Sequence, residues 1–246
     1  HIKKKIIYIY IYMNKNVKFF IIFLLIIIIV IYIINNYFRI AIVGSGPVTE
    51  EEITEINKYN IIAVMNYNRE FSNIDIPIKA THYFTRYSTR ENSGKTRIAR
   101  DGGWFWGWDE KTDNFSVLKP ETYDTIKYII LLTDTQHPSQ KRDKFIDKVI
   151  KKYNNKKKVI ELSDSGWHRK NSIYKFNNKK YKHDKGPTTG IVSINYMLEK
   201  YPLHTIHIYG MNSTKVNKDH DLKSEKEMIK ECRRCKLHKT HKDTIH

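Results

Sequence analysis

Short runs of apolar, β-branched residues alternate with segments of helical periodicity along the chain. Each run ends on glycine or on polar residues, as buried strands do, and the runs lie at 39–43, 61–65, 126–132, 158–162 and 205–209. Strands that alternate with helices in this way pair in parallel, because each crossover returns the chain to the same edge of the sheet. The pattern therefore predicts a three-layer α/β fold.

Four helices are expected between and after these strands. Their inward positions recur at helical spacing: Ile53 and Ile56, then Phe145, Val149 and Ile150, then Ile191, Ile194, Leu198 and Tyr201. Thr49 and Glu52 have the spacing of a capping box at the start of the first helix. A fourth helix is expected to carry Glu225, and the Lys- and Asn-rich segment 169–185 is expected to be a polar linker.

The longest apolar run lies before the first strand. No charged residue occurs between Lys18 and Arg39, and about 20 apolar residues of helix match the thickness of a bilayer core. The run exceeds the usual signal-peptide core and no small-residue cleavage site follows it, which favours a retained anchor. Lysines before the run predict a cytosolic N-terminus, hence a single-pass type II topology with a lumenal domain.

The pattern also sets the expected boundaries. They are a cytosolic tail at 1–18, a membrane anchor at 19–38, a catalytic-sized domain at 39–230 and a basic tail at 231–246. Met13 is the expected first residue of the natural chain, which leaves residues 1–12 outside it. A single domain of this size can bury a substantial core.

The composition limits the classes of binding partner that are expected. The formal net charge is +18, which suits an anionic membrane, an anionic substrate or nucleic acid. The chain has no zinc-finger spacing, RNP-like motif or heptad-backed basic region, so a nucleic-acid partner is not expected. Its two cysteines, Cys232 and Cys235, both lie near the C-terminus, so no disulfide can cross-link the body of the domain.

The segment from Gly186 to Gly190, Gly-Pro-Thr-Thr-Gly, opens the third expected helix. Backbone N–H groups at a helix start have no intrahelical acceptor, and the helix dipole is positive there, so the segment suits a phosphate. An ordinary N-cap is the alternative interpretation of the same residues.

A second glycine-rich segment follows the first strand. Gly44-Ser45-Gly46 occupies the place of a dinucleotide-binding turn, but Thr49 stands where that fingerprint has its third glycine. The second strand ends in the amides Asn66 and Asn68 instead of a ribose-binding acid. A nicotinamide site is therefore not favoured.

Three separated segments resemble, in order and spacing, the sialylmotifs of the family 29 glycosyltransferases, the sialyltransferases. Residues 40–46 with 64–68 are similar to the large motif, residues 186–190 through 208–210 to the small motif, and His220 with Glu225 to the very small motif. The resemblance covers most of residues 39–230. The chain departs from the family pattern in Asn66, which stands in place of Arg, in Met211, which stands in place of Phe, and in lacking the disulfide that joins the two larger motifs.

The resemblance implies a Rossmann-like three-layer α/β/α domain, a variant of the GT-A type. The implied reaction transfers sialic acid, or a related sugar, from a CMP-activated donor to a glycan hydroxyl on a glycoprotein or glycolipid, with inversion. No metal or other cofactor is implied, and the implied location is the lumen of the Golgi or an equivalent compartment.

The resemblance also implies roles for individual residues. His220 would be the general base, oriented by Asp219 or Asp221, and Glu225 would complete the catalytic set. The expected donor-binding residues are Ser45, Gly46, Asn66, Asn68, Thr188, Thr189 and Gly190.

Two other functions fit parts of the sequence. Asp219 and Asp221 could bridge a divalent ion and a diphosphate in a metal-dependent nucleotide-sugar transferase. A membrane-tethered protein that binds anionic glycans without catalysis would suit the positive net charge.

The alternating Trp104, Trp106 and Trp108 could stack on sugar rings or pack on the core.

The C-terminal segment and two sequons allow two further interpretations, zinc binding and glycosylation. Cys232, Cys235, His238 and His241 recur at every third position and could in principle bind zinc, although a frayed basic tail is the favoured interpretation. Asn114 and Asn212 begin glycosylation sequons that suit a lumenal domain.

Overall fold

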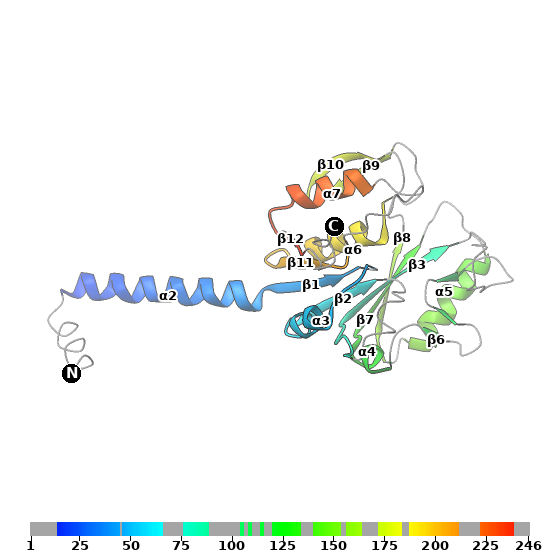
Figure 1. Ribbon diagram of the computed structural model, residues 1–246, viewed down its shortest axis with the longest axis horizontal. Coiled ribbons are helices and arrows are strands. Elements are labelled where there is room, and N and C mark those ends of the chain that lie inside the picture. Colours follow the sequence, from blue (N-terminus) through cyan, green and yellow to red (C-terminus); the bar gives the residue numbers. More distant parts are fainter. Residues whose placement is uncertain are drawn as a thin grey trace. The chain divides into compact units, whose positions relative to one another are not determined.

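The computed structural model describes two compact units, His1–Phe38 and Arg39–His246 (Figure 1). The residues described are 14–44, 46–65, 76–88, 104–105, 108–109, 114–115, 120–133, 140–153, 156–163, 172–183, 187–211 and 222–238. Each unit is considered by itself.

The first unit contains one long helix, α2 (Lys15–Tyr37). Its large apolar side chains are exposed; Phe19, for example, is 74% exposed. The stretch Lys15–Ile33 has a mean hydropathy of 2.9, and none of it is buried by the rest of the protein. The helix is therefore long and apolar enough to cross a membrane, as the sequence predicts.

The second unit is built on a sheet of seven parallel strands. Their bounds are β1 (Arg39–Val43), β2 (Ile61–Met65), β3 (His82–Ser88), β7 (Tyr128–Thr133), β8 (Lys158–Ser163), β11 (Thr205–Tyr209) and β12 (Cys235–Leu237). They lie in the order β12-β11-β1-β2-β3-β7-β8. The short strand β4 (Trp104–Phe105) pairs antiparallel with β3, and β5 (Trp108–Asp109) pairs with β6 (Asn114–Phe115). The predicted α/β class and parallel pairing are confirmed.

Alternate residues of the strands enter two separate hydrophobic clusters. In β1, Ala41 and Val43 belong to one cluster, whereas Ile40 and Ile42 belong to the other. All four are fully buried. A strand that is apolar on both faces needs helices on both sides, which explains why the central strands read as continuous apolar runs.

Helices cover both faces of the sheet. On one side lie α3 (Glu50–Ile56), α4 (Pro120–Thr125) and α5 (Gln140–Tyr153), of which α3 and α5 add side chains to one cluster. On the other side α6 (Thr189–Lys200) and α7 (Leu222–Glu231) supply the second cluster, and Figure 1 shows them above the sheet, opposite α3 and α4. The predicted capping box is present, because Thr49 N donates to Glu52 Oε2 at 2.8 Å and Glu52 N donates to Thr49 Oγ1 at 3.2 Å.

Several elements lie where the sequence predicts none, among them β3, α4, a hairpin and the last strand of the sheet. The segment expected to be a polar linker contains a hairpin, β9 (Ser172–Phe176) and β10 (Lys179–His183). Its turn residues Asn177 and Asn178 have φ of 47° and 66°, as a type I′ turn requires, and Phe176 is fully buried. The strand β12 extends the sheet into the segment expected to be a tail. It is only three residues long and mostly exposed, so it carries no apolar strand signal.

His82, the first residue of β3, is a buried histidine that is 1% exposed. Its ring stacks on Tyr128, Nδ1 lies 2.8 Å from Thr81 Oγ1, and Nε2 lies 3.2 Å from Tyr201 Oη. Burial, reinforced by the charges of Lys200 and Lys127, lowers the pKa of His82 to about 3.

The fold is expected to lose stability as the pH falls below about 6.5, the ordinary pKa of histidine. Between that pH and about 3 the unfolded chain binds a proton at His82 that the folded protein excludes, so protons favour unfolding. By pH 5 this single group lowers the unfolding free energy by about 2 kcal/mol. Urea titrations at pH 5 and 7 measure the loss, and His82→Gln should make it smaller. An equal loss in that variant would contradict the assignment.

Candidate functional site

The candidate site lies at the carboxyl edge of the sheet, between β1 and β11. From β1 the chain crosses through α3 to β2 on one side, whereas β11 pairs with β1 on the other. The strand order therefore changes direction between these two strands. In open parallel sheets, ligands bind at such a point, where the loops after the two strands diverge.

Here the loops after β1 and β11 contact each other directly. Gly44 N donates to Tyr209 O at 2.8 Å, and Gly46 N donates to Gly210 O at 2.7 Å. A Cβ added to Gly46 would lie 2.6 Å from Gly210 O, and Gly210 itself has φ of +61°. Glycine is thus required at both positions, at one by the close approach of two backbones and at the other by the left-handed conformation.

The start of α6 lies beside this pair of loops. Thr188 is the N-cap, and its Oγ1 accepts a hydrogen bond from Ile191 N at 3.2 Å. A Cβ on Gly190 would overlap the end of the Met211 side chain, so Met211 after β11 packs against the first turn of α6. The predicted phosphate segment and the glycine loops therefore belong to one place in the fold.

The carboxylate of Glu225, in the first turn of α7, accepts two hydrogen bonds from Thr188, the N-cap of α6. Its Oε1 accepts from Thr188 N at 2.6 Å, and its Oε2 accepts from Thr188 Oγ1 at 2.7 Å. The side chain is buried, with 4% exposed. A carboxylate at a helix N-terminus is stabilised by the helix dipole and by the N–H group that it accepts from. Both carboxylate oxygens of Glu225 therefore accept a hydrogen bond from Thr188.

This contact also changes the role of Thr188. Its hydroxyl donates to Glu225 and accepts from Ile191 N, so the hydroxyl is occupied within the protein. The next two residues, Thr189 and Gly190, begin the first turn of α6, and both are buried, whereas Thr188 is partly exposed.

The structure thus brings five of the predicted site residues together: Gly46, Thr188, Thr189, Gly190 and Glu225. The other five lie outside the described residues: Ser45, Asn66, Asn68, Asp219 and His220. Asp221, of the alternative metal site, and Trp106, of the tryptophan segment, lie outside them too.

Sequence reasoning missed three residues of this site. Gly44, Gly210 and Met211 fill the space between the two loops and α6. The sequence places Gly44 and Gly210 inside the two larger motif-like segments, but it assigns neither glycine to the site. Two glycines, each placed directly after a buried strand, were the signal that could have indicated a contact between the two loops.

The C-terminal cysteines and histidine have other partners than a metal. Cys232 and Cys235 form a disulfide, and His238 Nε2 lies 2.9 Å from Nδ1 of His207. Burial, followed by the charge of Arg39, lowers the pKa of His207 to about 4, so both rings are neutral near pH 7. Across the described ranges, no group of three or more His, Cys, Asp or Glu side chains could hold a metal ion.

Comparison of the chain with protein-family models, with curated proteins and with solved structures gives no match in any of the three. The site's own geometry therefore carries the functional argument.

Proposed function

We propose that the chain is a membrane-anchored glycosyltransferase that transfers sialic acid, or a related sugar, from a CMP-activated donor to a glycan hydroxyl with inversion. The proposal includes a Rossmann-like, GT-A-like domain. The observation that carries it is the Glu225–Thr188 contact, at 2.6 and 2.7 Å. This contact connects α7, which follows Asp219 and His220 in the sequence, to the start of α6, where a phosphate could bind. Neither sequence segment alone predicts the contact.

The second support is the loop contact between Gly46 N and Gly210 O, at 2.7 Å. It places the end of the first motif-like segment beside the end of the second. Three segments that resemble sialylmotifs in the sequence thus meet around one edge of the sheet.

In the proposed reaction, the acceptor hydroxyl attacks the anomeric carbon of the donor while the bond from that carbon to the phosphate oxygen breaks. The nucleotide leaves as a phosphate monoester, and the hydroxyl proton passes to His220. His220 precedes Leu222, the first residue of α7, by two residues, and two residues of chain span at most about 7 Å. Glu225, by fixing the first turn of α7, would hold the base near the donor.

The leaving phosphate would be received by the N–H groups of Thr189 and Gly190. These groups and the dipole of α6 stabilise negative charge where it develops, which is the role that a metal has in many other transferases. Ser45, Gly46, Asn66 and Asn68 are proposed to hold the nucleotide. Glu225 places a negative charge near the same helix end, and the donor phosphate is therefore proposed to lie on the side of Thr189 and Gly190.

The proposed location is a lumenal compartment reached by type II insertion, the Golgi or its equivalent. The apolar helix α2 supports the anchor. The Cys232–Cys235 disulfide supports an oxidising compartment, because thiols in the cytosol are kept reduced.

A donor screen tests the proposed function. The full chain in mild detergent is given CMP-, UDP- and GDP-activated sugars, each with and without EDTA, and release of the free nucleotide is measured. We expect release from a CMP-sugar that EDTA does not reduce. Turnover of a UDP- or GDP-sugar that EDTA abolishes and Mn²⁺ restores would reject the proposal in favour of a metal-dependent transferase.

A further inference from the structure

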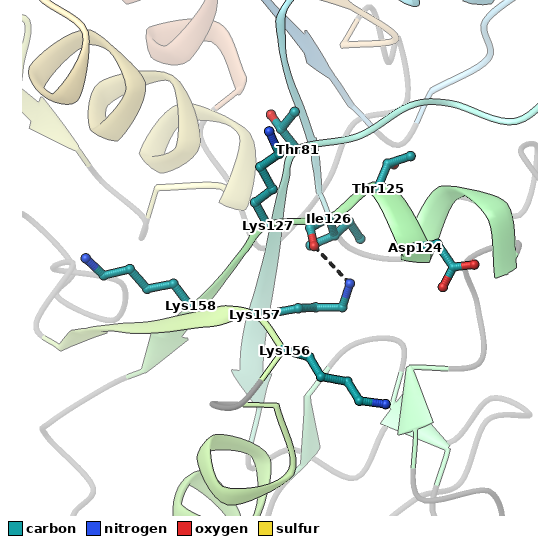
Figure 2. A pocket seen from close by; sticks show the side chains of 8 residues that line it. All are labelled: Thr81, Asp124, Thr125, Ile126, Lys127, Lys156, Lys157 and Lys158. Atoms are coloured by element: carbon teal, nitrogen blue, oxygen red, sulfur yellow. Dashed lines mark hydrogen bonds between the residues drawn. The ribbon is translucent and has the colours of Figure 1, made fainter.

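A basic pocket opens at the amino edge of the sheet, the edge opposite to the candidate site (Figure 2). It lies where β3, β7 and β8 begin, and its volume is about 720 Å³. The charged residues that line it are four lysines and one aspartate: Lys127, Lys156, Lys157, Lys158 and Asp124. Four positive charges and one negative charge give the lining a net charge of +3. The lining therefore favours an anionic ligand.

Lys157 is the buried cation of this pocket. The residue is only 9% exposed, and its Nζ donates to Ile126 O at 2.9 Å, which ties the turn before β8 to the segment before β7. Burial lowers the pKa of the Lys157 ammonium, and the nearby charge of Asp124 offsets this effect only in part. A buried ammonium is costly unless negative charge lies close to it. An anion in the pocket would therefore stabilise Lys157 in its charged form.

The other three lysines are exposed. Lys127 and Lys158 lie on neighbouring segments of the chain, because Lys158 N donates to Lys127 O at 2.9 Å. None of the side-chain ion pairs among the described residues includes Lys127, Lys156 or Lys158. Figure 2 shows the lysine side chains directed to different sides of the pocket. Such an arrangement suits several separated anionic groups better than one compact anion.

We propose that this pocket binds a soluble ligand that contains a short chain of phosphate groups, either inorganic polyphosphate or a nucleoside triphosphate. A single phosphate carries at most about two negative charges near pH 7, which cannot balance a lining of +3. The volume of about 720 Å³ lies in the range of small-molecule sites, about 300–1,000 Å³, and exceeds what one phosphate needs. Lysine binds phosphate as a point charge, so separated lysines can each hold a different phosphate of the chain.

A structural role for the lysines is the competing explanation. Lys156 and Lys157 follow the end of α5 at Tyr153, and their charges could serve only to offset the negative end of that helix. Replacement of the lysines would then lower stability and leave anion binding unchanged. A ligand site predicts the reverse. Neither α2 nor the candidate site enters the proposal, so its test is separate from the donor screen.

Calorimetric titration of the full chain in mild detergent tests the proposal. We expect tripolyphosphate to bind at least about tenfold more tightly than inorganic phosphate, because each further exposed ion pair contributes up to about fivefold. The affinity should fall steeply with added salt. ATP that binds no more tightly than tripolyphosphate assigns the phosphate chain as the ligand, whereas tighter binding of ATP assigns a nucleotide. Equal affinities for tripolyphosphate and phosphate would overturn the proposal.

A charge-matched pair of variants locates the binding. Lys156→Gln/Lys158→Gln should weaken tripolyphosphate binding by about tenfold, while urea titration shows unchanged stability. Lys175→Gln/Lys180→Gln removes the same charge from two exposed residues that lie opposite each other in the hairpin, and it should change the affinity by less than about twofold. Equal weakening in the two variants would show that net charge, and not this pocket, attracts the anion. Lower stability with unchanged affinity in Lys156→Gln/Lys158→Gln would establish the structural role instead.

Asp124→Asn tests the same site in the opposite direction. Asp124 is exposed and supplies the one negative charge of the lining. Its replacement removes a charge that repels phosphate, so tripolyphosphate should bind about two- to threefold more tightly. Unchanged or weaker binding in this variant would contradict the placement of the phosphate chain in the pocket.

Discussion

Glu225→Ala is expected to lower the unfolding free energy by about 3 kcal/mol and to slow sugar transfer by about 100-fold. The first effect follows because removal of the buried carboxylate leaves the N–H and hydroxyl of Thr188 without their acceptor at a partly buried site. The second follows because the first turn of α7 then loses its contact with α6, so a base placed before that turn is misplaced. Glu227, exposed on the same helix, offers the matched control Glu227→Ala.

The measurement is a double-mutant cycle with Thr188→Val in the full chain, followed by urea titration and a transfer assay. Hydrogen bonds to a charged group predict a coupling free energy of about 1.5–3 kcal/mol between the two substitutions. Thr188→Ser keeps both hydrogen bonds and should recover most of the stability and rate. A coupling near zero, or a loss in Glu227→Ala as large as in Glu225→Ala, would remove the contact from the proposed mechanism.

His220→Ala is expected to lower kcat by about 10²–10⁴-fold while donor binding changes little. An acceptor hydroxyl is a poor nucleophile near neutral pH, and the proposed imidazole takes its proton as the new bond forms. The donor phosphate is proposed to contact α6 and not the histidine. The substitution should therefore lower kcat without weakening the binding of the donor.

Three measurements check this result. Nucleotide release gives kcat, equilibrium binding of the donor gives its affinity, and thermal unfolding shows whether the variant is folded. Added imidazole should restore part of the rate, because a small base can occupy the space that the side chain leaves. Unchanged turnover in a folded His220→Ala protein would rule out the histidine as the base.

Much of the sheet could be predicted because it is apolar on both faces. The runs at β1, β2, β7, β8 and β11 are buried by helices on either side, so they read as unbroken apolar stretches. By contrast, β3 is central but contains His82, Thr85 and Arg86 among its buried apolar residues. The ring of His82, for example, has the distant partners Tyr128 and Tyr201, which no local pattern reveals.

The hairpin was missed for a different reason. Lys175, Lys179 and Lys180 of this hairpin are exposed, and the number of lysines in the segment suggested a solvated linker. The informative residues were Asn177 and Asn178, which adopt positive φ between two segments containing aromatic residues. Asparagine tolerates that conformation better than most residues, so the pair was a usable turn signal.

The candidate site could be predicted in its parts but not in its assembly. Glycine after a strand and threonine before a helix indicate local structure, and both are present at Gly46 and Thr188. The contact of Glu225 with Thr188 links residues that are 37 positions apart. Only the packing of α6 and α7 on the same face creates it, and the sequence of either helix alone does not specify that packing.

The position of β1 in the sheet has a consequence for biosynthesis. β1 is made directly after α2, yet it pairs with β11, which follows it by about 160 residues in the chain. At ribosomal rates of about 5–20 residues per second, β1 waits on the order of ten seconds with one side unpaired. An unpaired strand edge can pair with another chain, so the nascent domain is most exposed to wrong pairing in the interval before β11 is made.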